Sequence, residues 1–174
     1  MHPQRTDTVS EIKHRRFLRE KEAAQILDEF TQKLRLDFQK LLDTKNTGIE
    51  IAETPTAKIF FINGKPVIAN LKDTLVPTLL FDKALMLLPK ITVNMGAVPH
   101  ICNGADLMAP GIVRIEGDFN ANDYVLVIDE RHQKPLAVTI ALIDSQDARN
   151  LKHGKVAKNL HYVGDDLWNQ LKKA

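Results

Sequence analysis

Residues 95–115 read MGAVPHICNGADLMAPGIVRI, and this stretch decides the fold of the second half of the chain. It contains two turn signals, Asn103-Gly104 and Pro110-Gly111, and an alternating apolar pattern follows them. Residues 95–105 suit one or two helical turns that close at Asn103-Gly104, because glycine accepts the left-handed geometry of a helix C-cap. The stretch therefore predicts a short helix, a bare loop and then a strand that begins near Pro110.

Two interpretations of this bare loop stay open on chemistry alone. In the first, Gly104 caps a helix and the absence of large side chains is incidental. In the second, the bare backbone lets another polymer approach closely. The N–H groups of Gly104, Ala105 and Asp106 would then donate to phosphate or sugar oxygens, and Leu107 and Met108 would offer a flat apolar patch to a nucleobase.

Strand patterns dominate the rest of the second half. Short apolar or alternating runs predict strands at residues 90–94, 110–117, 124–130, 135–144 and 160–164. Residues 145–151 suit one helical turn capped by Ser145, and Asp165-Asp166 caps a terminal helix in which Trp168 packs into the core. Many short strands with only small helical pieces favour a compact mixed barrel.

The first half predicts a helical region followed by strands. Apolar residues recur at helical spacing across residues 11–42, and Arg19-Glu20-Lys21-Glu22 marks the start of this helix or of a second one. Residues 49–54 alternate, and residues 57–70 form a hairpin with Asn63-Gly64 at its tip. Residues 74–89 add a short strand and a helix, with Pro77 near its first turn. This half is therefore α+β.

Composition excludes several classes of protein. The chain has 174 residues, of which 44% are hydrophobic and 26% charged, as expected for one large or two small globular domains. It contains no apolar run of about 20 residues, and its first residues lack the apolar core of a signal peptide. The single cysteine, Cys102, permits no internal disulfide and is expected to be a small packed hydrophobe. We expect a cytoplasmic protein that does not enter a membrane.

Enzyme and metal motifs are absent from the sequence. There is no phosphate-binding glycine motif and no nucleophile elbow, and none of the six histidines has the spacing of a metal site. We therefore predict no catalytic residue, no metal and no cofactor.

Charge is distributed unevenly along the second half. Residues 116–147 carry seven acids and two bases, whereas residues 149–174 carry six bases and two acids, so the net charge of +2 hides a basic segment. Grouped bases of this kind neutralise phosphates, although a solvated surface has the same composition. The N-terminal cluster Arg15, Arg16 and Arg19 leaves the same two alternatives, and we favour solvation of a helix.

The run from Met95 to Ile115 resembles the signature of PUA domains, the RNA-binding module named for pseudouridine synthases and archaeosine transglycosylases. The matching order is a short strand, Gly-Ala, a short helix, Asn-Gly-Ala-Asp-Leu-Met-x-Pro-Gly-Ile and a strand. The resemblance implies an RNA-contacting face made by the helix, the loop and the last strand. The residues placed on this face are Gly96, Ala97, Asn103, Gly104, Ala105, Asp106, Leu107, Met108, Arg114, Lys155, Lys158 and Asn159.

The whole chain resembles the malignant T-cell-amplified sequence protein family and its archaeal relatives. Matching pieces are the hairpin at 59–66, the run Leu-Val-Pro-Thr-Leu at 75–79, Leu-Pro-Lys at 88–90 and the ending at 159–168. The resemblance implies an N-terminal α+β domain over residues 1–88 and a C-terminal PUA-type mixed β-barrel over residues 89–174.

The same resemblance implies a non-enzymatic protein that contacts structured RNA, tRNA or rRNA, in translation initiation or ribosome recycling. The small ribosomal subunit and an initiation-factor-like protein are the implied partners. Two alternatives stay open: a subunit that presents RNA to a separate modifying enzyme, and a protein-interaction adaptor.

Overall fold

The computed structural model describes residue 12 and residues 14–42 and 48–174, and it confirms an α+β architecture built on two sheets. The first sheet has the order β1-β2-β3-β4-β5, and every neighbouring pair is antiparallel. Its strands are β1 (Arg15–Phe17), β2 (Ile49–Glu53), β3 (Lys58–Ile62), β4 (Lys65–Leu71) and β5 (Thr74–Pro77). The helices of this half are α1 (Glu20–Leu34), α2 (Phe38–Leu41) and α3 (Asp82–Leu85).

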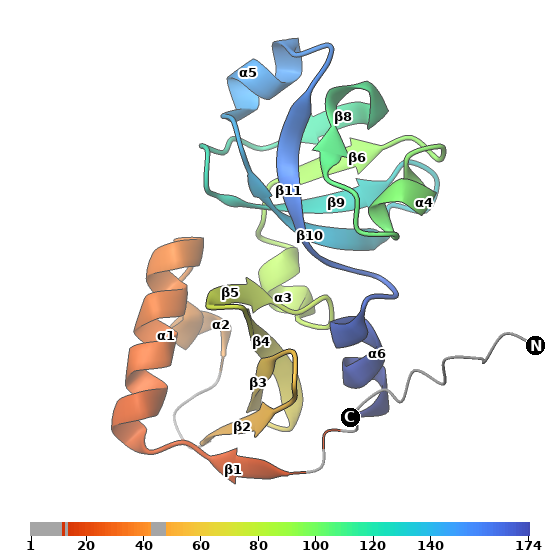
Figure 1. Cartoon of the computed structure of the whole chain (residues 1–174). Coiled ribbons are helices and arrows are strands. Elements are labelled where there is room, and N and C mark those ends of the chain that lie inside the picture. Colours follow the sequence, from red (N-terminus) through yellow and green to blue (C-terminus); the bar gives the residue numbers. More distant parts are fainter. Residues whose placement is uncertain (1–11, 13, 43–47) are drawn as a thin grey trace, which may run out of the picture.

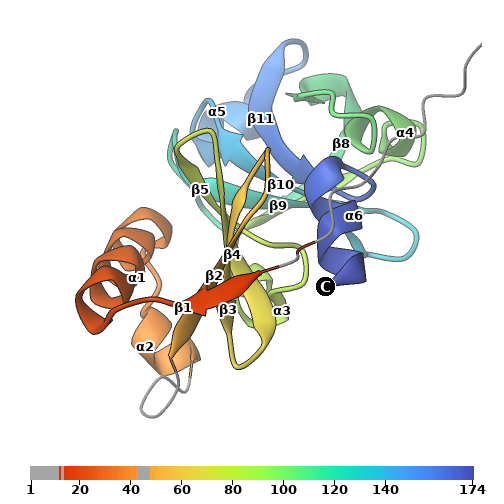
Figure 2. The same ribbon diagram turned by 60° about the horizontal axis from the view of Figure 1, so that its bottom comes forward.

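Helices cover both faces of this sheet, and they come from opposite ends of the chain. Successive residues of a strand point to opposite faces, so Phe60 packs in one core with Phe30 of α1, whereas Ile59 and Phe61 pack in another with Leu167. Leu167 belongs to the terminal helix α6 (Asp166–Lys173). Figures 1 and 2 show α1 and α6 on opposite sides of the sheet. The end of the chain thus returns to the first sheet.

The second sheet has the order β7-β11-β10-β9-β6-β8, with β6 and β9 parallel and the other pairs antiparallel. Its strands are β6 (Lys90–Val93), β7 (Leu107–Met108), β8 (Ile112–Glu116), β9 (Tyr124–Asp129), β10 (Pro135–Ala141) and β11 (Lys155–Tyr162). The two edge strands, β7 and β8, are separated only by a 3₁₀ turn at Ala109–Gly111, so the sheet curls until its edges nearly meet. This curled mixed sheet confirms the predicted PUA-type fold. Its short helices are α4 (Val98–Ile101) and α5 (Ser145–Asn150).

Several local predictions in the second half were wrong. The last strand covers Lys155–Tyr162 rather than 160–164, and the predicted strand at 110–117 begins at Ile112 after the 3₁₀ turn. Ser145 does not cap α5. The Asp144 side chain accepts from the N–H of Asp147 instead, and the Ser145 hydroxyl accepts from the N–H of Phe119.

Other corrections fall in the first half. Pro77 ends β5 and does not open a helix, since α3 begins at Asp82. Arg15 and Arg16 lie in β1 and not in a helix: the Arg15 guanidinium is 3.9 Å from the centroid of the Phe61 ring, and the Arg16 guanidinium is 4.0 Å from Glu22 of α1. Arg19 is the N-cap of α1. The first residues of the chain, which lack the apolar core of a signal peptide, lie outside the described residues. Among those residues, no helix is both long and apolar enough to cross a bilayer.

Candidate functional site

The bare loop after α4 has the backbone geometry that the sequence predicts. α4 ends at Ile101, and Gly104 takes a φ of +91°, in the left-handed region that favours glycine. The N–H of Gly104 donates to the Ile101 carbonyl (3.1 Å), and the N–H of Ala105 donates to the His100 carbonyl (3.0 Å). The expectation that these two N–H groups are free for a ligand is therefore wrong, because they close the end of the helix.

Gly104 packs against an aromatic ring that the sequence argument did not select. A Cβ at this position would lie 3.1–3.3 Å from the hydroxyl oxygen, Cε1 and Cζ of Tyr162. The loop thus approaches β11 closely, and a side chain at Gly104 would strain the backbone and press on Tyr162. Tyr162 follows Asn159 in the run Asn-Leu-His-Tyr, so its place near the end of the last strand was the available signal.

Asp106 and Asn159 fasten the loop to β11. One Asp106 carboxylate oxygen accepts from the backbone N–H of Asn159 (3.0 Å), and the other lies 3.2 Å from the Lys155 ammonium. The Asn159 amide donates to the carbonyls of Ile101 and Ala105, at 3.0 and 3.1 Å. These residues were selected as RNA contacts, and the structure gives them a positioning role within the chain.

A hollow of about 420 Å³ lies beside the loop. Its lining residues include Asn94, Ala97, His100, Met108, Pro110 and Gly111. Met108 is 43% exposed, whereas Leu107 is 1% exposed and contributes only to the wall. The prediction that Leu107 lies on a surface patch is therefore wrong, while Met108 does present an apolar side chain.

The segment that leads into α4 forms one edge of the hollow, and two side chains fix it by accepting hydrogen bonds from backbone N–H groups. The Asn94 side chain accepts from the N–H of Ala97 (2.9 Å), and the Glu130 carboxylate accepts from the N–H of Met95 (3.0 Å). Gly96 is exposed between them. Gly111 allows a close approach here, because a Cβ on it would lie 3.0 Å from the Cβ of Ala97. Neither contact was predicted from the sequence: the Asn94 contact spans only three residues, whereas Glu130 and Met95 lie 35 residues apart.

The remaining selected residues lie apart from this hollow. Asn103 is exposed in the turn after α4. Arg114 lies on β8, at the edge of the sheet opposite β7 in strand order, and its side chain is 3.0 Å from Glu116. Lys158 is exposed on β11 and lines a second, larger hollow between the two sheets.

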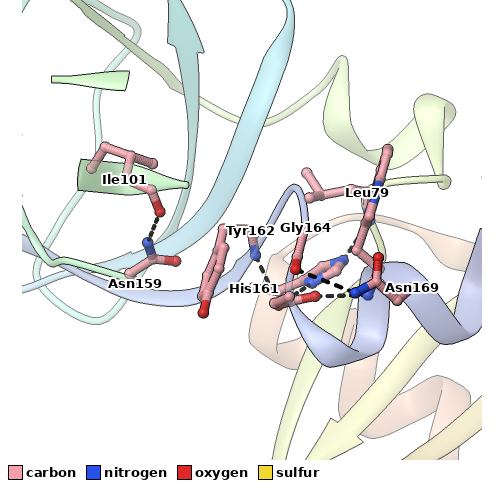
Figure 3. A network of polar contacts seen from close by, with 9 residues as sticks. Leu79, Ile101, Asn159, His161, Tyr162, Gly164 and Asn169 are labelled. Atoms are coloured by element: carbon pink, nitrogen blue, oxygen red, sulfur yellow. Dashed lines mark hydrogen bonds and ion pairs between the residues drawn. The ribbon is translucent and has the colours of Figure 1, made fainter. Parts of the chain in front are cut away.

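Two buried side chains of the second sheet hold the run 75–79 of the first half. The Tyr124 hydroxyl donates to the Leu75 carbonyl, and the ring Nε2 of His161 accepts from the N–H of Leu79 (3.2 Å). The other ring nitrogen of His161 is 2.8 Å from Asp165, which also accepts from the N–H of Trp168 and caps α6. Figure 3 shows His161 beside Leu79. We call these contacts the joint. Burial, with the nearby Glu29 charge, raises the pKa of Tyr124 to about 12.

Three further predictions concern single residues of the second half. Asp165 caps the terminal helix, and Trp168 packs against the core as a partly buried side chain. Cys102 is partly buried against the second core, and burial raises the pKa of its thiol. Among the described residues, no group of three or more histidine, cysteine or acidic side chains is arranged to hold a metal.

Comparison with known families places two domain models on the chain. Residues 89–163 match the PUA domain, and residues 14–82 match a domain of unknown function, DUF1947. An uncharacterized protein of Methanocaldococcus jannaschii is 38% identical over 162 residues, which cover 91% of this chain and 98% of that protein.

Named eukaryotic proteins and a solved structure are also similar. Translation machinery-associated protein 20 of Schizosaccharomyces pombe is 27% identical over 140 residues, covering 77% of each chain. Malignant T-cell-amplified sequence 1-A of Xenopus laevis is 27% identical over 117 residues, covering 64% of this chain and 65% of that one. A crystal structure of a PUA domain protein of Aeropyrum pernix in a tartrate complex has a TM-score of 0.78 at 27% identity and covers 91% of both chains.

Proposed function

Because the chain belongs to the family of PUA-domain proteins with an N-terminal DUF1947 domain, shared with the malignant T-cell-amplified sequence and translation machinery-associated proteins, we propose that it binds structured RNA in translation. The proposal includes a division into an N-terminal domain over residues 1–88 and a PUA domain over residues 89–174. It assigns no reaction to the chain.

The observation that carries the proposal is the apolar hollow beside Gly104, with the partly exposed Met108 at its wall. Unpaired nucleobases bind by stacking on flat apolar or aromatic surfaces, and RNA proteins read loops and ends in this way. Hydrogen bonds of Asp106 and Asn159 hold the loop that borders the hollow against β11. A ligand would therefore meet a surface that is already ordered, and little conformational entropy would be lost on binding.

Two of the cations expected to contact RNA, one beside the loop and one on β8, are paired with carboxylates in the free protein. Lys155 is paired with Asp106, and Arg114 with Glu116. Both cations are exposed to solvent, so each pair contributes little to stability and the cation can exchange its carboxylate for a phosphate. This supports a phosphate contact by Lys155 near the hollow, while Arg114 would meet RNA only where it extends across β8.

The names of the relatives support a place in the translation machinery. We propose tRNA or rRNA as the RNA, and the small ribosomal subunit with an initiation-factor-like protein as the assembly, during initiation or recycling. We propose the cytoplasm as its location. Sequencing the RNA that copurifies with the protein would identify the ligand.

Titration of labelled tRNA at several salt concentrations tests the proposal. Met108→Glu is expected to lower affinity by about tenfold or more, since a carboxylate replaces a stacking surface and repels phosphates. Met86→Glu is the matched control, because Met86 is 73% exposed and follows α3, away from the hollow. Equal losses in the two variants, or wild-type protein that binds no RNA, would contradict the proposal.

A further inference from the structure

A hollow of about 680 Å³ lies between the two sheets and not beside the loop. The turn between β4 and β5 forms one wall, β11 forms another, and the start of α6 closes the end. We call this the interdomain groove; its lining residues include Thr56, Lys72, Thr74, Lys158 and Tyr162. Both domains are therefore needed to build it.

Two unpaired cations line the groove. Lys72 comes from the first domain and Lys158 from the second, and both are exposed. Across residues 12, 14–42 and 48–174, neither ammonium group lies within 4.0 Å of a carboxylate, whereas Lys155, Arg114 and Arg149 are each paired. Within the described part of the chain, the groove therefore holds two lysines without a carboxylate partner, one from each domain.

Two acidic residues also line the groove, Asp165 and Asp166. Asp165 is occupied: it accepts from the N–H groups of Trp168 (2.7 Å) and Tyr162 (3.0 Å) and contacts His161. Asp166 begins α6, where a carboxylate is stabilised by the helix dipole. Both carboxylates thus belong to the start of the terminal helix, while the two lysines lie on the β4–β5 turn and on β11.

The position of Lys72 is set by a tight turn. Lys72 and Asp73 have φ values of +48° and +66°, the geometry of a two-residue hairpin whose twist matches its strands. β4 and β5 pair up to Leu71 and Thr74 on either side of it. The backbone of Lys72 is therefore positioned at the groove by the paired strands on either side of the turn.

Tyr162 connects the groove with the face proposed for RNA. Its ring contacts Gly104 on the loop side, and the same residue lines the groove. An RNA strand that leaves the hollow beside Gly104 would pass this ring and then meet Lys158 and Lys72. Aromatic rings that stack bases, together with cations that follow the backbone, are the elements of single-strand binding sites.

We propose that the interdomain groove binds an unpaired RNA segment, with Tyr162 beside a base and Lys72 and Lys158 on its phosphates. This rests on the proposed RNA binding and extends it, because it makes the N-terminal domain part of the RNA site.

Fluorescence anisotropy with a short labelled RNA hairpin tests the groove. The hairpin is used blunt, or with an unpaired extension of about four nucleotides at either end. Wild-type protein is expected to bind one extended form more tightly than the blunt form. Lys72→Gln should reduce the affinity for that form by about fivefold near 0.1 M salt, the effect of one single-strand phosphate contact, and lower the salt slope by about 0.7. Its affinity for the blunt hairpin should not change.

Lys65→Gln is the matched control, since Lys65 is an exposed lysine at the other end of β4 and its loss changes the net charge equally. Two results would overturn the proposal for the groove: an equal reduction of RNA affinity in Lys65→Gln, or equal affinity of the wild type for extended and blunt hairpins. Either result would leave RNA binding by the PUA domain intact. Wild-type protein that binds neither hairpin would instead count against the proposed function.

Discussion

The joint and the loop are both fastened by side chains that bond to backbone groups, but their surroundings differ. At the joint, Tyr124 and His161 are 5% and 0% exposed, so water cannot replace a lost bond. At the loop, Asn159 is partly buried and Lys155 is exposed, so solvent or a ligand can take over their contacts. The comparison indicates that the joint supplies stability, whereas the loop remains available for binding.

Removing the histidine of the joint should have the largest effect. His161→Ala leaves the N–H of Leu79 and the Asp165 carboxylate without this partner and opens a cavity. We expect the free energy of unfolding to fall by about 3 kcal/mol or more, measured by urea titration. His153→Ala, at an exposed position, should change it by less than about 0.5 kcal/mol. A loss below about 1 kcal/mol in His161→Ala would remove the joint as a source of stability.

The tyrosine of the joint predicts a pH dependence at the alkaline end. Burial raises its pKa from 10.0 to about 12, so the folded state favours the neutral phenol. Its contribution is complete below about pH 10 and is lost as pH rises through 12, which amounts to about 2–3 kcal/mol. Tyr124→Phe should lose about 1 kcal/mol at neutral pH, with the bond to Leu75, and should lack this alkaline component. An unchanged alkaline loss in Tyr124→Phe would assign it to another group.

The amide that fastens the loop should have a smaller and more local effect. Asn159→Ala removes the bonds to the Ile101 and Ala105 carbonyls, which solvent can partly replace. We expect a loss of about 1–2 kcal/mol, with faster hydrogen exchange at the Gly104 and Ala105 amides. Asn169→Ala is the control, because its amide makes only a 3.4 Å contact with Gly164. Exchange that stays as slow as in the wild type would show that Asn159 does not hold the loop.

The loop was more predictable from sequence than the joint. The end of its helix and the left-handed conformation of its glycine could be predicted from Asn103-Gly104, because the conformation of a turn depends mainly on its own residues. The joint depends on side chains that lie 49 and 82 residues from the backbone groups they bind. A tyrosine and a histidine within strands carry no local signal of such partners.

Strand limits were mispredicted where polar residues lie in a sheet. β11 includes Lys155, Lys158 and Asn159, and its polar side chains concealed the first five residues of the strand. The same residues were selected for binding, but sequence could not distinguish the paired Lys155 from the unpaired Lys158, since pairing depends on Asp106 in a distant loop.

The smallest expected effect concerns the ion pair of the loop. Lys155 and Asp106 side chains are 61% and 28% exposed, so water screens their attraction. A double-mutant cycle with Lys155→Gln and Asp106→Asn should give a coupling of at most about 0.5–1 kcal/mol in unfolding, which disappears near 1 M salt. Asp106 also accepts from the N–H of Asn159, and the cycle separates that bond from the pair. A coupling above about 2 kcal/mol, insensitive to salt, would mean that Lys155 is as fixed as the joint and is not free to exchange its carboxylate for a phosphate.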